Sequence, residues 1–188
     1  MTVKKLGIVG MVLLLLLCGC EKNMDMEELQ QQYQGIAKAQ MSAEVVCHLS
    51  SENRSFTVEC NYDREQGATT SITAPKEVKG ISATVTGDKL TVAYDGTILP
   101  AGKLTDICPA NCLPYLLHAI SDGYIIEQGE ETLEDSTCQR IAFDTTAGDG
   151  SKILCTVWFD GSNTPCYAEF AQNDKVILTA RLLSFRVL

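Results

Sequence analysis

The sequence predicts an α+β protein that is mostly β, a curved antiparallel sheet covered by an N-terminal helix and a mid-chain helix. Three observations predict this class. After residue 42, apolar and polar residues alternate with a period of two in most segments, as in strands with one buried face. Turn signals separate these segments, as expected for consecutive hairpins. Only segments 26–39 and 115–120 have a helical character. Together the segments predict a curved antiparallel sheet of about 10–11 strands.

The N-terminal segment is predicted to be an export signal. Two lysines precede an apolar run of about 12 residues, which is shorter than the roughly 20 residues of a membrane-spanning helix. The run ends in Leu17-Cys18-Gly19-Cys20, which resembles the lipobox of bacterial lipoproteins. In that family the chain is cut just before the cysteine, whose sulfur carries a diacylglyceryl group. The resemblance implies a lipid anchor on Cys20; an ordinary signal peptide with incidental cysteines is the alternative.

The division of the chain follows from this cleavage. We expect residues 1–19 to be a lipoprotein signal peptide, residues 20–25 a lipidated tether and residues 26–188 a single domain. Loss of Lys4 and Lys5 takes the net charge from −9 to −11. Such an acidic surface argues against nucleic acid and against electrostatic binding to anionic lipid. The protein is therefore expected to lie outside the cytoplasm, held to the cell membrane by its N-terminal diacylglyceryl anchor.

The first element of the domain is a predicted amphipathic helix over 26–39. Its apolar residues recur every three or four positions, and glutamines fill the opposite face. Gly35 is expected to weaken the helix without ending it. The polar face has almost no Lys or Arg, so we expect the helix to pack on its own domain. A helix on the membrane surface beside the lipid anchor is the alternative.

Two strands, 42–50 and 55–62, are predicted to follow as a hairpin. Apolar and polar residues alternate along both. A two-residue turn at Asn53-Arg54 would set Cys47 opposite Cys60 on the apolar side. Directly opposed residues lie close enough for a disulfide after some local adjustment. Cys47 and Cys60 are therefore disulfide candidates, and two packed thiols are the alternative.

Three central strands are predicted at 68–74, 81–85 and 90–94. Gly87-Asp88 is a hairpin signal between the last two. A turn there sets apolar residues opposite one another throughout, which specifies the register: Val85 with Leu90, Ala83 with Val92 and Ile81 with Tyr94.

A short, strongly apolar helix is predicted over about 115–120, ended by Ser121-Asp122-Gly123. His118 on this helix is expected in the core or a groove. Cys108 and Cys112 precede the helix. Two cysteines four positions apart suggest zinc, but zinc needs two further ligands and the sequence has no second close pair. We therefore expect a Cys108–Cys112 disulfide or two packed thiols, and no metal.

The C-terminal part is predicted to be a meander of five strands, at about 123–128, 136–144, 152–159, 164–172 and 175–187. The strand from Lys152 has apolar residues on both faces. A strand that is buried on both sides lies under a covering element. The two predicted helices are the available covers.

The turn after residue 159 decides how Cys155 and Cys166 are placed. A tight turn at Asp160-Gly161 sets these two cysteines opposite each other, which makes them disulfide candidates. A four-residue loop from 160 to 163 instead sets Cys155 opposite Ala168. Both alternatives stay open.

The cysteine count leaves one thiol over. Of nine cysteines, one is removed with the signal and one is lipidated. The remaining number is odd, so at least one cysteine is free or pairs outside the chain. Cys138 is either that cysteine or a partner of Cys108 or Cys112. Export permits disulfides without requiring them.

The pattern as a whole resembles the LolA/LolB-like bacterial lipoproteins, and among them the germination-type lipoproteins of clostridia. The resemblance covers most of 30–188 and lies in short motifs: Ala74-Pro75-Lys76-Glu77-Val78-Lys79-Gly80-Ile81, Tyr94-Asp95-Gly96 before Leu99, and Pro165 followed by Ala168-Glu169-Phe170. It implies a half-open β-barrel closed by helices around an apolar cavity. Family members carry lipid or lipoprotein acyl chains, or bind other envelope proteins. The cysteine set departs from the family pattern and implies a stapled, less adaptable barrel.

Catalysis is not expected. His48 and His118 lie on different predicted elements, and the sequence has no metal helix motif, nucleophile elbow or phosphate loop. We expect no cofactor. The leading hypothesis is a membrane-anchored module that binds an apolar ligand, such as a lipid or acyl chain, in the envelope. The alternative is a non-catalytic adaptor that binds an envelope or spore-cortex hydrolase, as in germination lipoproteins.

Overall fold

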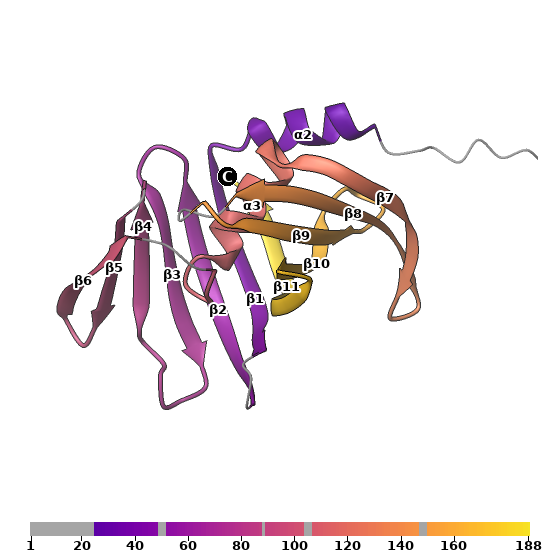
Figure 1. Cartoon of the computed structure of the whole chain (residues 1–188). Coiled ribbons are helices and arrows are strands. Elements are labelled where there is room, and N and C mark those ends of the chain that lie inside the picture. Colours follow the sequence, from indigo (N-terminus) through magenta and orange to yellow (C-terminus); the bar gives the residue numbers. More distant parts are fainter. Residues whose placement is uncertain (1–24, 49–51, 88, 104–106, 147–149) are drawn as a thin grey trace, which may run out of the picture.

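The computed structural model describes residues 25–48, 52–87, 89–103, 107–146 and 150–188 (Figure 1). Its helices are α2 (Met26–Gln34) and α3 (Cys112–Asp122). The strands are β1 (Lys38–His48), β2 (Asn53–Asp63), β3 (Gly67–Ala74), β4 (Ser82–Thr86), β5 (Lys89–Tyr94), β6 (Thr97–Lys103), β7 (Tyr124–Leu133), β8 (Ser136–Thr146), β9 (Lys152–Phe159), β10 (Pro165–Gln172) and β11 (Lys175–Val187).

These strands form one antiparallel sheet of eleven strands, in the order β6-β5-β4-β3-β2-β1-β11-β10-β9-β8-β7. The mostly-β class and the antiparallel hairpin order are therefore confirmed. Among the described strands, β6 and β7 are the two edges, so the sheet is not closed into a barrel. The first and last strands pair with each other in the middle of the sheet. Figure 1 shows the sheet bent around α3, with α2 at one end of the bend.

Helix α2 begins where the sequence predicts and ends earlier. The Asp25 side chain caps it, accepting hydrogen bonds from the backbone N–H groups of Glu27 at 2.9 Å and Glu28 at 3.2 Å. The helix ends at Gln34, and Gly35 serves as its C-cap. The predicted extension to residue 39 is wrong. The residues that follow alternate between buried and exposed and pair in β1, where the sheet supplies the hydrogen bonds that a longer helix would give up.

Two glutamine side chains of α2 hold the end of α3. The Gln30 amide donates to the carbonyls of Ile120 at 3.3 Å and Gly123 at 2.9 Å, and the Gln34 amide donates to the carbonyl of Ser121 at 2.9 Å. The carbonyls of Ile120 and Ser121 belong to the last turn of α3, where carbonyls have no partners within the helix, and Gly123 is the residue directly after it. Helix α2 therefore packs on its own domain, through glutamines that the sequence pattern alone would place in solvent.

The predicted hairpin register is confirmed where the sequence has a clear turn signal between the two strands. Val85 pairs with Leu90 and Ala83 with Val92, whereas Ile81 lies just before β4. Strand β6 was not predicted. It contains Pro100, which has no N–H to donate, and such a residue is tolerated at an edge.

Candidate functional site

The candidate site is a part of the sheet that extends beyond the packed core. One row of cross-strand partners runs from the core to the β6 edge, and partners directly opposite each other project to the same face. The row is Met41, Cys60, Thr70, Ala83, Val92 and Leu99. We call the face that carries this row the inner face. It is the face on which the core lies.

Burial falls along this row toward the edge. Met41, Cys60 and Thr70 are at most 2% exposed, and Ala83 is 4% exposed. Val92 is half-buried, and Leu99 is 61% exposed. The change follows the position of α3, which packs mainly against α2, β8 and β2.

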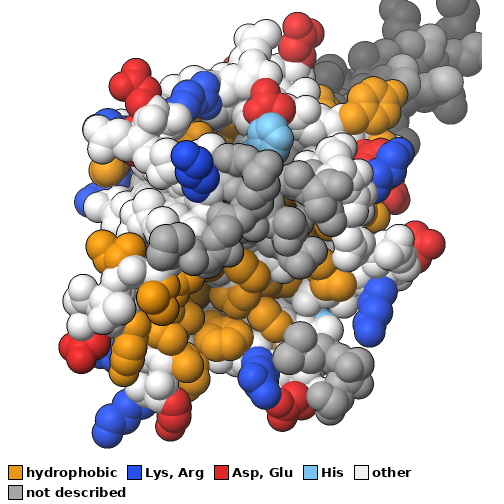
Figure 2. All heavy atoms as spheres, turned by 60° about the vertical axis from the view of Figure 1, so that its left-hand side comes forward, with side chains coloured by type: hydrophobic (Ala, Val, Ile, Leu, Met, Phe, Trp, Pro, Cys, Tyr) orange, Lys and Arg blue, Asp and Glu red, His pale blue; other side chains and the backbone are white. Residues whose placement is uncertain are grey.

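The exposed end of the row widens into an apolar area. We define the open inner face by five side chains that share this side of β4, β5 and β6: Val85, Leu90, Val92, Tyr94 and Leu99. All are half-buried or exposed, with Tyr94 at 55%. Figure 2, which brings this part of the molecule forward, shows hydrophobic side chains gathered in one continuous area. Covering a large apolar side chain contributes about 1.5–3 kcal/mol, so this face can bind an apolar surface.

The space beneath α3 is different, because side chains fill it. Leu113, Leu116 and Ile120 of α3 meet Phe143 and Phe170 of the sheet, and all five are 0% exposed. In the part of the chain that the structure describes, an apolar ligand therefore has room on the open inner face and not under α3.

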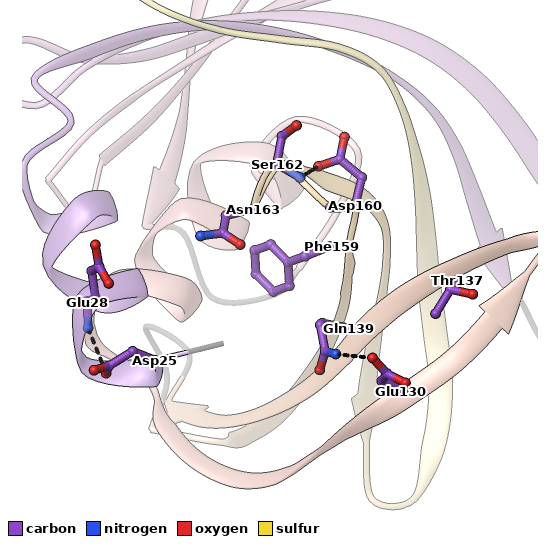
Figure 3. Close-up of a pocket in the computed structure, with 10 residues that line it drawn as sticks. Asp25, Glu28, Glu130, Thr137, Gln139, Phe159, Asp160, Ser162 and Asn163 are labelled. Atoms are coloured by element: carbon purple, nitrogen blue, oxygen red, sulfur yellow. Dashed lines mark hydrogen bonds between the residues drawn. The ribbon is translucent and has the colours of Figure 1, made fainter. Parts of the chain in front are cut away.

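A polar pocket of about 550 Å³ lies elsewhere, between the start of α2, the β7–β8 ladder and the β9–β10 turn (Figure 3). Four of the residues that line it are acidic: Asp25, Glu28, Glu130 and Asp160. Three of these carboxylates have partners in the chain. Asp25 caps α2, Asp160 accepts from the backbone N–H of Ser162 at 2.8 Å, and Glu130 accepts from Gln139 at 3.0 Å. The polar lining of this pocket does not suit an apolar ligand.

The predicted register of Cys47 and Cys60 is wrong. Cys47 is opposite Arg54, and Cys60 is opposite Met41. Asn53 and Arg54 are the first residues of β2 rather than a turn. This register sets apolar residues against one another, with Ala43 opposite Val58 and Val45 opposite Phe56. The two cysteines are thiols in the structure, and the geometric reason for bonding them is lost.

Neither predicted placement of Cys155 and Cys166 is observed. Cys155 lies opposite Phe170, because the turn after β9 is longer than expected and a register shift follows between Pro165 and Tyr167. Both cysteines are thiols. The Cys166 Sγ lies instead 3.8 Å from the Sγ of Cys138. This pair was not predicted.

Cys108 and Cys112 lie in the turn that starts α3. The Cys112 N–H donates to the Cys108 carbonyl at 3.0 Å. Burial raises the pKa of the Cys112 thiol well above its ordinary value, and the neighbouring thiols of Cys108, Cys60 and Cys47 raise it further. These four cysteines therefore occupy one neighbourhood between α3 and the β1–β2 hairpin. The described residues contain no group of three or more His, Cys, Asp or Glu side chains arranged to hold a metal.

His118 is on the exposed side of α3, so its expected place in the core or a groove is wrong. Its Nδ1 lies 3.1 Å from an Asp122 carboxylate oxygen, and the hydroxyl of Ser121 donates to the same oxygen at 2.6 Å. A serine nucleophile needs a histidine that accepts its proton. Here the serine donates to the aspartate, so the three residues form a polar end to the helix.

Cys20 lies outside the described residues, so the predicted lipid anchor stays a prediction. Neither of the helices that the structure describes combines the length and the hydrophobicity required to cross a bilayer.

Comparison with known proteins identifies the fold. No family model and no curated protein matches the chain. Among solved structures, a LolA superfamily protein from Nitrosomonas europaea is 12% identical, with a TM-score of 0.50 over 87% of this chain and 91% of that one. A domain assigned to outer membrane lipoprotein sorting in Vibrio parahaemolyticus is 10% identical, with a TM-score of 0.50 over 90% and 93%. An uncharacterized conserved protein from Thermus thermophilus is 8% identical, with a TM-score of 0.51 over 87% and 85%. The LolA-like fold inferred from the sequence is therefore confirmed.

Proposed function

We propose that this chain is a membrane-anchored extracytoplasmic lipoprotein whose LolA-like domain binds an apolar chain, a lipid or acyl group, on the open inner face. The single observation that supports this role most is the row that leaves the core and ends in the half-buried Val92 and the exposed Leu99. A monomeric protein keeps a contiguous apolar face of this kind when something binds there. The proposed role is non-catalytic. The lipidated Cys20 is the proposed anchor, and the fold shared with lipoprotein-sorting domains is consistent with it.

Two neighbouring residues test the ligand site. Leu99 and Ile98 are 61% and 69% exposed, but Leu99 is on the inner face and Ile98 on the opposite one. We expect Leu99→Asp to weaken binding of a fluorescent fatty acid at least tenfold, because it places a charge against the apolar chain, and tenfold corresponds to about 1.4 kcal/mol. The matched Ile98→Asp variant should bind within about twofold of the parent.

The binding measurement uses the soluble domain without its N-terminal lipid anchor. Mass spectrometry of this domain should also find lipid that co-purifies with it. Equal losses of affinity in both variants, or a parent protein that neither carries lipid nor binds the fatty acid, would remove this function.

The filled space beneath α3 favours a second candidate, an adaptor that binds an envelope hydrolase. A domain with a filled interior offers a rigid surface to a partner protein rather than a cavity to a ligand. Affinity capture from membranes should then return one hydrolase or amidase in stoichiometric amounts with the parent protein. If capture returns no such enzyme while fatty acid binds, the adaptor role is excluded in favour of the first.

A further inference from the structure

Two thiols on strands that are not neighbours lie in contact. Cys138 is on β8 and is 4% exposed, and Cys166 is near the start of β10 and is half-buried. Strand β9 lies between them. Their sulfur atoms are nevertheless 3.8 Å apart.

A local irregularity brings the sulfurs together. The β9–β10 register shifts between Pro165 and Tyr167, so Cys166 is the extra residue of a bulge. Bulges redirect a side chain relative to a regular ladder. The redirected Cys166 thiol donates to the Trp158 carbonyl of β9 at 3.2 Å, which places it over β9 on the way to Cys138.

We propose that Cys138 and Cys166 form a disulfide that joins β8 to β10 across β9 in the oxidised protein. The reaction is exchange with an existing disulfide RSSR, either an oxidised low-molecular-weight thiol or an exported oxidoreductase. The more accessible Cys166 attacks as its thiolate, forms a mixed disulfide and releases one RS⁻. Cys138 then attacks the Cys166 sulfur and expels the second RS⁻. In balance, two cysteine thiols and RSSR give one protein disulfide and two RSH, so the protein loses two electrons and RSSR gains them.

The cysteine pairs predicted from the sequence are less suited to this reaction. Cys155 is 0% exposed and lies opposite Phe170, so an oxidant cannot reach it in the folded protein. Cys47 and Cys60 are on different rungs of the β1–β2 ladder. The Cys138–Cys166 pair combines sulfur contact with one accessible member.

The surroundings determine how the bond behaves once formed. Burial and the neighbouring Cys138 raise the pKa of Cys166 to about 11. Little thiolate is present at neutral pH, so the uncatalysed reaction is slow. A thiol with a high pKa is also a poor leaving group, so a disulfide that contains it is slow to be reduced. The bond is therefore a durable one rather than a rapid switch.

The disulfide would also fix the turn that holds α2. It closes a loop of 29 residues, from 138 to 166, that contains the turn after β9. In that turn the Asn163 carbonyl accepts a hydrogen bond from the Tyr33 hydroxyl of α2 at 2.8 Å. Oxidation therefore restrains the contact between the helix and the sheet.

The test uses the full-length protein purified from membranes in detergent. After treatment with oxidised glutathione, free thiols are alkylated and the protein is digested without reduction. We expect a linked peptide that contains Cys138 and Cys166, with Cys155 alkylated only after denaturation. Unfolding followed by the fluorescence of the single tryptophan, Trp158, should show a Tm about 5–10 °C higher than in the reduced protein.

Cys138→Ser and Cys166→Ser should each lose the linked peptide and the rise in Tm, while the control Cys47→Ser keeps both. Oxidised parent protein in which both cysteines are alkylated, or in which Cys166 is joined to another cysteine, would overturn the proposal. This peptide map needs no variant, so the result holds even where a variant fails to fold.

Discussion

The cysteines inside this domain behave first as small apolar side chains. Cys60, Cys112 and Cys155 are at most 1% exposed and belong to the main core cluster. A buried thiol packs like a small hydrophobic group, because its neutral form needs little hydration. The thiolate does need hydration, so burial raises the pKa of all three.

This burial predicts loss of stability at alkaline pH. Burial raises the pKa of Cys60 from 9.0 to about 11, partly offset by the neighbouring Thr70 side chain. Below pH 9 the Cys60 thiol keeps its proton in both the folded and the unfolded chain, so its contribution to the free energy of unfolding is fully present. Between about pH 9 and pH 11 only the unfolded chain releases it, so the free energy of unfolding falls, by up to roughly 1.4 kcal/mol per pH unit for this thiol.

Urea unfolding of the reduced protein at pH 8, 9 and 10 measures this loss. Cys60→Ala should be less stable than the parent at pH 8, and its stability should decline less steeply with pH. Parallel pH profiles for the two proteins would show that Cys60 does not titrate as the structure indicates.

Sequence reasoning found the cysteines but not their neighbours. Cys47 and Cys60 looked paired because the turn was placed at Asn53-Arg54, and a shift of the turn moved the whole register. Cys138 and Cys166 meet only because of a bulge and an intervening strand. Nothing in their spacing signals such a contact. A sequence pattern predicts which strand carries each cysteine. Which cysteines touch each other across the sheet depends here on a bulge, which no local pattern encodes.

At the scale of elements, two glycines with left-handed backbone have different surroundings. Gly67 starts β3 with φ +99°, and a Cβ there would lie 2.1 Å from the Val85 carbonyl oxygen. Gly80 has φ +91°, and a Cβ there would meet nothing within 4 Å. The two positions therefore separate backbone strain from collision with a neighbouring strand.

Alanine at these two positions should have unequal costs. Gly80→Ala brings strain alone and should lower the free energy of unfolding by about 1–2 kcal/mol. Gly67→Ala adds a collision that forces β4 away from β3, and we expect a loss of roughly 3–4 kcal/mol. Urea midpoints with m-values measure both. A Gly67→Ala protein as stable as Gly80→Ala would mean that the β3–β4 approach is looser than described.

The elements themselves were largely predictable, because most strands have one buried face. Val85, Leu90, Ala83 and Val92 show this most clearly, since turn and pattern agree. The predictions were wrong where hydrogen bonding or packing elsewhere in the fold outweighed the local sequence pattern. Gly35 ends α2, because the sheet offers hydrogen bonds to the next segment. Strand β9 is buried on both faces, but Arg140 and Tyr167 pack on its Trp158 side rather than a helix.

The candidate site was only partly predictable. The alternation along β4 and β5 indicated an apolar face, and Leu99 completes it from β6, which was not predicted. A strand interrupted by Pro100 has no clear pattern, and only pairing with β5 shows that Leu99 and Ile98 point to opposite faces. Which part of a face stays uncovered depends on where α3 packs, and this cannot be predicted from a local pattern.

At the scale of the whole molecule, attachment of the protein to the membrane is expected to depend on one atom, the sulfur of Cys20. The net charge is −9 before cleavage, so electrostatics does not hold the protein on anionic lipid. Two acyl chains bind almost permanently, because each buried methylene contributes about 0.8 kcal/mol. We expect Cys20→Ser to leave the membrane fraction while its urea midpoint stays that of the parent domain.

Cys18→Ser is the matched control, because residue 18 is expected to leave with the signal peptide. It should fractionate with the membrane as the parent does. Retention of Cys20→Ser in the membrane fraction would contradict the lipid anchor.

The pairing of β1 with β11 has a consequence for the order of assembly. Each half of the sheet is a run of neighbours along the chain, but the halves join only through the β1–β11 ladder, which runs from Ala39 opposite Val187 to Cys47 opposite Leu178. Beyond the end of this ladder, the Leu188 N–H donates to the Lys38 carbonyl at 3.0 Å. Closing so long a loop is slow and entropically costly. As the chain emerges N-terminus first, β1 keeps one bare edge until the thirteen residues of β11 arrive. Of the described strands, β11 is synthesised last, and it joins two separate ladders. Until then the nascent chain has an exposed strand edge that a chaperone would have to shield.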